Sequence, residues 1–170
     1  MTTGAAFWLA LVGVVLAVAS LTWQFATFRL TGSLVRAELV HGCIGPGGAT
    51  YGEPGKFNVA MMVAQGYVME VVGIEVFNRG RIGVNVTRWA MHSSKKDSYM
   101  PVGDQHGPDL PHRLEPGVSA QWFMPMYTMQ KIVRVNAEVL HRPNPAQCWA
   151  TVQLGTGKTV KAKRTMNLRG

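Results

Sequence analysis

The stretch that decides the fold is YVMEVVGIEVFNRGRIGVNVTRWAMH, residues 67–92. Its first part, 67–77, is dense in β-branched and aromatic residues that alternate with period two, which is typical of a strand. The tetrad Asn78-Arg79-Gly80-Arg81 comes next, and both Asn and Gly tolerate positive φ. The tetrad therefore predicts a tight turn that closes a hairpin between residues 67–77 and 82–92.

The second strand of this unit, 82–92, changes its apolar parity along the way. Val84 and Val86 share one parity, whereas Trp89 and Met91 share the other. One extra residue inserted into a strand has this effect, so the pattern predicts a β-bulge near Arg88.

Short segments with the same β pattern lie before and after this unit. The predicted strands are 34–41, 118–126, 132–141, 149–154 and 158–163, and 57–65 fits either a strand or a short helical turn. Frequent turns and the lack of a clear helical pattern predict an all-β, immunoglobulin-like antiparallel β-sandwich, with a Greek-key barrel as the rival. Its core is expected to hold Trp89, Trp122 and Trp149.

Two further segments are expected to be irregular. Residues 42–56 carry glycines and prolines at a density that predicts a loop. Residues 93–111 form a long polar insertion between two predicted strands.

No charged side chain precedes Arg29, and residues 5–28 form one apolar stretch. As a helix at about 1.5 Å per residue, the stretch is roughly 36 Å long, which is enough to cross a bilayer core of about 30 Å. Trp8 and Trp23 lie near its two ends, where amphipathic rings favour the membrane interface. We therefore predict an N-terminal tail (1–4), a transmembrane helix (5–28), a linker (29–33) and one β-sandwich domain (34–170).

Residues within and beside this stretch predict whether it is cleaved and on which side of the membrane the β domain lies. Ala17-Val18-Ala19 offers a small-residue cleavage site, but no basic residue precedes it and the apolar stretch continues beyond it. We therefore predict a retained anchor rather than a cleaved signal peptide. Arg29 and Arg36 follow the stretch, so the positive-inside rule predicts a single-pass cell-membrane protein with its β domain in the cytoplasm.

The chain is basic, with 17 Lys and Arg against 9 Asp and Glu and a net charge of +8. The candidate lipid-facing cations are Arg29, Lys158, Lys161, Lys163 and Arg164. Because the predicted linker is short, we expect these residues to meet lipid head groups rather than nucleic acid. A simple solvated face is the alternative.

The two cysteines, Cys43 and Cys148, are not part of a CxxC motif, so neither a zinc site nor a thioredoxin-like site is indicated. They lie near the first and last predicted strands. The sequence is compatible with two free thiols and with a Cys43–Cys148 disulfide. A cytoplasmic domain favours the free thiols.

No grouping of residues predicts catalysis or a cofactor. The GTGKT sequence at 155–159 has Val152 where a P-loop requires Gly, and no helix is predicted after it, so it predicts a hairpin turn. The cluster of Asp104, His106, Asp109 and His112 has metal-ligand chemistry, but it lies in a segment rich in Pro and Gly, and we predict no metal site. Ser98 and Ser119 lack a nucleophile motif.

The sequence EVFNRGRIGVNVTRWAM, residues 75–91, resembles the V-x-N-x-G-x-x-x-V-x-V hairpin of bacterial immunoglobulin-like modules. LPHRLEPGVSAQWFM, residues 110–124, is similar to the turn and strand that follow in them. With one helix ahead, the chain resembles small single-pass membrane proteins of actinobacteria and their phages, whose function is unassigned. The resemblance implies a fold but no activity.

The expected function is therefore protein–protein interaction at the membrane by a non-catalytic β domain. The partner would be a membrane protein, a membrane-proximal protein or a second copy of the chain. If the protein is phage-encoded, modification of the host envelope is the expected role. The alternatives are an exported, disulfide-bonded envelope component that faces outward and an enzyme with a site in residues 93–113. No small-molecule substrate is indicated.

Overall fold

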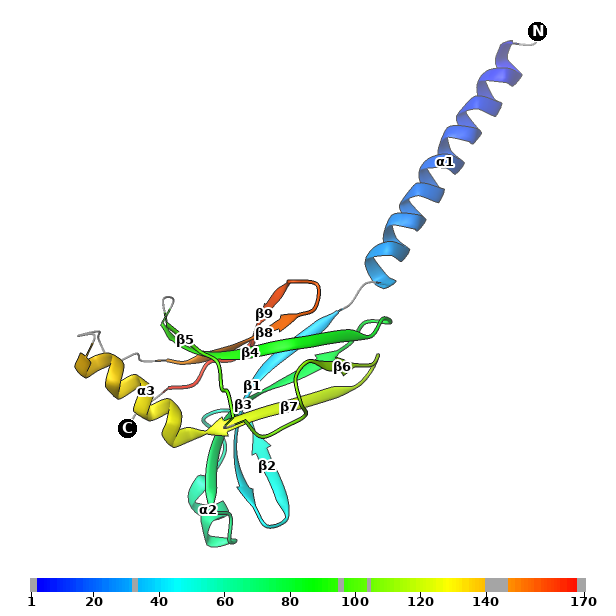
Figure 1. The fold of residues 1–170 in the computed structure, drawn as a ribbon. Coiled ribbons are helices and arrows are strands. Elements are labelled where there is room, and N and C mark those ends of the chain that lie inside the picture. Colours follow the sequence, from blue (N-terminus) through cyan, green and yellow to red (C-terminus); the bar gives the residue numbers. More distant parts are fainter. Residues whose placement is uncertain (1–2, 32–33, 95–96, 104, 140–146, 168–170) are drawn as a thin grey trace.

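The computed structural model describes residues 3–31, 34–94, 97–103, 105–139 and 147–167. An N-terminal helix projects from one end of a β-rich domain, and two short helices lie toward the other end (Figure 1). The elements in chain order are α1 (Thr3–Thr31), β1 (Val35–Gly45), β2 (Gly48–Gly52), α2 (Val59–Ala64), β3 (Met69–Asn78), β4 (Val84–Ser94), β5 (Asp97–Tyr99), β6 (His112–Leu114), β7 (Ser119–Pro125), α3 (Met126–Val139), β8 (Trp149–Leu154) and β9 (Thr159–Lys161).

The first helix, α1, is long and apolar enough to cross a membrane. Its span Ala6–Thr27 has a mean hydropathy of 2.1, and none of it is buried against the domain. Trp8 and Trp23 are 64% and 71% exposed. The Thr22 hydroxyl donates to the Val18 carbonyl one turn back, at 2.7 Å, which satisfies this polar group within the helix as a lipid environment requires. The helix continues to Thr31, so the connection to β1 is shorter than the linker predicted from the sequence.

The domain consists of two antiparallel sheets that enclose one core. The first has the strand order β2-β1-β3-β7, and the second has the order β5-β4-β8-β9 with β6 paired to β4. Side chains from both sheets meet in the core, where Leu39, Ile74, Met91 and Trp122 are fully buried. The prediction of two antiparallel sheets is confirmed. The description as all-β is too narrow, because α2 and α3 are part of the domain.

The Asn78–Arg81 tetrad connects the two sheets and does not close a hairpin. β3 lies between β1 and β7 in the first sheet, whereas β4 pairs with β5, β6 and β8 in the second. The predicted hairpin between 67–77 and 82–92 is therefore wrong. The strands themselves are confirmed, and the tetrad is a corner from one layer to the other.

Asn78 explains this corner because its buried side chain supplies the hydrogen bonds that hold the turn. Its Nδ2 donates to the carbonyl oxygens of Ile82 and Leu114, at 2.8 and 3.1 Å. Its Oδ1 accepts a hydrogen bond from the Gly80 N–H at 3.0 Å, and its own N–H donates to the Val118 carbonyl at 3.1 Å. Leu114 and Val118 are distant in sequence, so the tertiary structure decides the path of the turn.

The glycine-rich segment after His41 is partly strand. β1 continues through Gly45 and pairs with β2, with Gly45 opposite Gly48, so the prediction that 42–56 is a loop is wrong for this part. Gly42 permits the close pairing, because a Cβ there would lie 2.3 Å from the Thr50 carbonyl oxygen. Here glycine serves the close approach of two strands rather than irregular structure.

The ambiguous segment 57–65 forms the short helix α2. The Asn58 side chain caps it by accepting a hydrogen bond from the Met61 N–H at 3.1 Å. Met62 packs into the domain, whereas Met61 is 50% exposed.

The predicted strand 132–141 is wrong, because its described part belongs to helix α3. Met126, Met129 and Val133 recur at helical spacing, and all three are buried. Val135, which the strand prediction placed on the same face as Val133, is 43% exposed. The alternating valines fit a strand locally, but the methionine stripe before them packs α3 onto β3 and β7.

Of the detailed predictions for β4, β7 and β8, those for the bulge and for two core tryptophans are confirmed, and one for a third tryptophan is not. The β4–β8 register shifts between Val86 and Arg88, where the bulge was expected. Trp89 and Trp122 are 2% and 0% exposed. Trp149 is only half-buried, so its predicted place in the core is wrong.

The predicted irregular insertion 93–111 begins with the end of β4 and contains β5, so that prediction is wrong for its first part. The described residues after β5, up to 111, lie against the sheets, and we call them the strap. The Trp122 indole N–H donates to the Pro108 carbonyl at 2.8 Å, and the Trp89 indole N–H donates to the Gln105 Oε1 at 3.2 Å. His106 forms an isolated antiparallel bridge with Phe123 of β7. The two core tryptophans thus hold the described part of the insertion in place.

Candidate functional site

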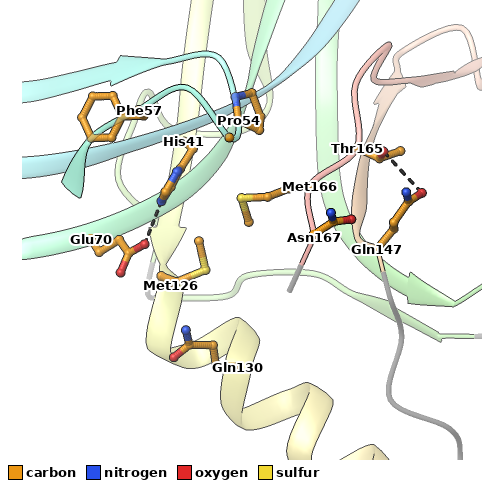
Figure 2. Close-up of a pocket in the computed structure, with 11 residues that line it drawn as sticks. His41, Pro54, Phe57, Glu70, Met126, Gln130, Gln147, Thr165, Met166 and Asn167 are labelled. Atoms are coloured by element: carbon orange, nitrogen blue, oxygen red, sulfur yellow. Dashed lines mark hydrogen bonds and ion pairs between the residues drawn. The ribbon is translucent and has the colours of Figure 1, made fainter. Parts of the chain in front are cut away.

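A cavity of about 410 Å³ opens where β1 and β3 meet the start of α3 and the segment after β9 (Figure 2). It lies in the half of the domain away from α1. The residues that line it are His41, Pro54, Gly55, Phe57, Glu70, Met126, Gln130, Gln147, Thr165, Met166 and Asn167.

An imidazole–carboxylate pair lies on one wall of the cavity. His41 Nε2 and Glu70 Oε1 are 2.7 Å apart, and the two side chains are 11% and 37% exposed. β1 pairs with β3 so that His41 lies opposite Val72, which places Glu70 diagonally beside it on the same face of the sheet. The edge of the Phe57 ring closes over the imidazole, with ring centroids 5.6 Å apart. His41 is thus fixed in orientation by a carboxylate and an aromatic ring.

The opposite side of the cavity combines flexible thioethers with amides. Met126 and Met166 extend into it from two different segments, and Gln130 reaches it from α3 (Figure 2). Thr165 donates a hydrogen bond to Gln147 at 3.4 Å. Such a lining offers hydrogen bonds to a polar or amide-containing ligand and adaptable apolar contacts to the rest of it.

The described lining of the cavity does not place a nucleophile beside a base. Among its described lining residues, Thr165 carries the only hydroxyl, and that hydroxyl already donates to Gln147. His41 is paired with Glu70 and not with a serine or cysteine. Nucleophilic catalysis requires a nucleophile within hydrogen-bond reach of its base, and the described lining does not provide that arrangement.

The His41–Glu70 pair was missed at the level of sequence, although a signal was present. Glu70 shares its parity with the core-facing residues Val72 and Ile74, and His41 shares its parity with Leu39. A charged and a titratable residue at the apolar positions of two strands would have indicated a buried pair or a site.

The structure separates the predicted run of lipid-facing cations. Lys158 lies in the turn before β9, and Lys163 is exposed beside β1, where its N–H donates to the Ala37 carbonyl. Arg164 pairs with Glu38 at 3.0 Å and with Glu53 at 3.3 Å, and these carboxylates also pair with Arg36 and Lys56. The Arg29 side chain lies outside the described part of the chain.

Lys161 belongs to a stacked arrangement on the outer face of the second sheet. Its Nζ lies 4.7 Å from the centre of the Trp149 ring, and that ring stacks on His92 at 5.5 Å with an interplanar angle of 4°. Burial lowers the pKa of His92, a backbone hydrogen bond with Asp97 opposes that effect, and the charge of Lys161 adds to it. His92 also bonds to the Thr151 hydroxyl at 2.8 Å.

The two cysteines are free thiols and both are buried, so the candidate disulfide is not formed in this structure. Burial raises the pKa of the Cys148 thiol to about 11. Burial, followed by the charge of Glu70, also raises the pKa of Cys43. Both thiols are therefore poor nucleophiles at neutral pH.

The candidate metal ligands of the insertion are not gathered into a site among the residues that the structure describes. His106 and Asp109 are exposed on the strap, and His112 packs edge-on against Trp122 at 5.9 Å. Asp104 lies outside the described residues. No described group of three or more His, Cys, Asp or Glu side chains could hold a metal ion. The GTGKT sequence forms the turn between β8 and β9, as predicted.

Comparison with known proteins adds no relative to these observations. No protein-family model matches the chain, and no curated protein matches it. Its function must therefore be argued from the geometry.

Proposed function

We propose that this protein is a membrane-anchored, non-catalytic module that binds another protein at the membrane through the cavity end of its β domain. The supporting observation is the surface around the cavity. α2 and α3, which begin at its border, expose Met61, Val63 and Tyr127 by 50%, 59% and 63%. Exposed Met and Tyr beside a thioether-lined cavity are features of protein-binding surfaces.

We further propose that the sandwich is of the immunoglobulin-like class, and its strand order supports this. In that class the first, second and fifth strands (A, B and E) share one sheet, and C, F and G share the other. The sequence β1-β3-β7 matches A-B-E, and β5-β4-β8-β9 matches C′-C-F-G. β2, β6 and the two short helices would then be additions to that class.

A photoreactive amino acid in place of the exposed Gln130 tests the binding proposal in native membranes. We expect one discrete crosslinked species. Adding Asn167→Trp, which fills the mouth of the cavity, should lower its yield about tenfold, the effect of losing roughly 1.4 kcal/mol of binding free energy. The matched control is Asn85→Trp, the same exchange at an exposed residue of β4 that does not line the cavity.

The proposal fails if crosslinking at Gln130 yields no discrete species. It also fails if Asn167→Trp and Asn85→Trp lower the yield equally. A species of twice the chain mass would identify a second copy as the partner. A phage role in modifying the host envelope requires that the partner be a host envelope protein.

We also propose that α1 is retained and that the domain lies in the cytoplasm, because Arg29 and Arg36 follow the span. The exposed turn residue Thr156 offers a test as Thr156→Cys. A membrane-impermeant maleimide should label this variant only after cells are permeabilised. The wild type should stay unlabelled in both conditions, because Cys43 and Cys148 are 1% and 0% exposed.

Labelling of Thr156→Cys on intact cells would contradict the cytoplasmic placement and support the exported alternative. That alternative also requires a disulfide. Alkylation after denaturation without reduction should modify both native thiols if they are free, and neither if they are paired.

A further inference from the structure

Three connections of the domain meet at the end where the chain arrives from α1. The corner 79–83 is joined to that entry because the Arg79 N–H donates to the Leu34 carbonyl at 2.7 Å. The turn 115–118 is joined to the same corner, since the Asn78 N–H donates to the Val118 carbonyl. The turn 155–158 lies at the same end, where β4 begins and β8 ends.

The short tether holds this end close to the bilayer. The apolar span ends at Thr27, and four more residues of helix rise by about 6 Å, to the level of the lipid head groups. From Thr31 to Leu34 the chain spans at most about 11 Å, even when fully extended. Leu34 therefore lies within reach of the head groups, and Figure 1 shows the same end of the domain turned toward α1.

The side chains at this end combine cations with exposed aliphatic groups. Arg79, Arg81 and Lys158 are exposed, and the Arg79 guanidinium lies 5.8 Å from the centre of the Phe77 ring. Within the described part of the chain, no carboxylate forms an ion pair with any of the three, whereas nearby Arg113 is paired with Glu115 at 2.6 Å. Leu34, Ile82 and Val118 are 53%, 56% and 47% exposed.

These two sets of side chains belong to one compact surface. The carbonyls of Ile82 and Val118 both accept hydrogen bonds from Asn78, and that of Leu34 accepts one from the adjacent Arg79. Leu34, Ile82 and Val118 are thus held next to one corner of the backbone, which also carries Arg79 and Arg81, and Lys158 lies in the turn 155–158 at the same end. We call Leu34, Arg79, Arg81, Ile82, Val118 and Lys158 the membrane-proximal tip.

We propose that the membrane-proximal tip docks on the surface of an anionic bilayer. The three cations contact lipid phosphates, and the three aliphatic side chains enter the boundary between head groups and acyl chains. Clustered Lys and Arg beside a membrane span are attracted to anionic lipid in this way, and aliphatic groups add burial at the interface. Docking holds the domain upright on α1, with the cavity end turned away from the bilayer.

This surface differs from the basic run that the sequence suggested. Only Lys158 belongs to both. Arg164 forms ion pairs with Glu38 and Glu53, and Lys161 lies on the outer face of the second sheet, over Trp149. The docking proposal is also independent of partner binding, because the cavity and the tip lie at opposite ends of the domain.

Bilayer discs that contain the full chain provide the test, with a spin label on Thr156→Cys as the probe of depth. The native thiols are buried and stay unlabelled. In discs that contain phosphatidylglycerol, collision of the label with dissolved oxygen should rise and collision with a water-soluble nickel chelate should fall, relative to discs of phosphatidylcholine. Each cation should contribute about fivefold to the docking equilibrium, hence roughly 100-fold for three.

The triple variant Arg79→Gln, Arg81→Gln, Lys158→Gln should therefore make the label equally solvent-exposed in both lipids. The control, Lys131→Gln, Arg134→Gln, Lys163→Gln, removes the same charge from exposed residues outside the tip and should behave as the wild type. Ile82→Ser with Val118→Ser should weaken docking in both lipids. Equal depth in the two lipids for the wild type, or equal losses in the two triple variants, would overturn the proposal.

Discussion

Replacing Asn78 with leucine is expected to lower the free energy of unfolding of the domain by about 3 kcal/mol. Asn78 is 0% exposed, and its side chain makes three hydrogen bonds to backbone groups. Leucine has a similar volume but leaves the Leu114 carbonyl and the Gly80 N–H without these partners. Each buried polar group that loses its partner costs roughly 1–3 kcal/mol. Urea unfolding of the full chain in non-ionic detergent, followed by tryptophan fluorescence, measures the loss.

Asn85→Leu is the matched control, because Asn85 is an exposed asparagine at the start of β4, directly after the corner. Its stability should change by no more than about 0.5 kcal/mol, as is usual for surface positions. A hairpin turn at Asn78 would make the two variants alike, since a turn asparagine contributes only locally. Equal effects of the two substitutions would contradict the corner and its hydrogen-bond network.

The sequence could predict the strands on either side of Asn78 but not the sheet to which each belongs. A hairpin turn and a corner between sheets use the same residue types, because both need backbone flexibility and a side chain that bonds locally. The deciding partners are the carbonyls of Leu34, Leu114 and Val118. Their proximity is a property of the tertiary structure, which local periodicity does not contain.

Helix α3 shows the same limit in another form. Its valines alternate as in a strand, whereas Met126, Met129 and Val133 follow a helical spacing. Both periods are present, and the packing of the methionine stripe on the core selects the helix. The bulge near Arg88 could be predicted because a change of parity has one simple cause within a strand.

The candidate site could be predicted only in part. The position of Glu70 on an apolar face is visible in the sequence, and so is that of His41. Their pairing is not, because it depends on the register between β1 and β3. Of the three cations of the tip, Lys158 could be proposed from the sequence, whereas Arg79 and Arg81 could not, because their turn reaches the same end of the domain only through the strand pairing.

Replacing Trp122 with alanine is expected to cost about 4 kcal/mol of unfolding free energy, the usual range for a buried aromatic side chain. Trp122 is fully buried between the two sheets. Its indole N–H also donates to the Pro108 carbonyl at 2.8 Å, which holds the strap against β7. The substitution should therefore destabilise the domain and also release the strap. Arg113 lies in β6, which directly follows the strap, so β6 should loosen with it and trypsin should cleave at the exposed Arg113 faster than in the wild type.

Two further substitutions separate the roles of Trp122. Trp122→Phe keeps an aromatic ring in the core but removes the donor to Pro108, so the loss from the hydrogen bond itself should be about 1 kcal/mol, with cleavage at Arg113 still accelerated. Trp149→Ala, on the outer face of the second sheet, should leave cleavage at Arg113 unchanged, because Trp149 stacks on His92 and has no hydrogen bond to the strap. If Trp122→Phe left cleavage unchanged while Trp122→Ala accelerated it, core packing, the Trp89–Gln105 hydrogen bond and the His106–Phe123 bridge would hold the strap without the Trp122 donor. The carbonyl of Pro108 would then add nothing to its attachment, and the assignment of the indole as its anchor would be wrong.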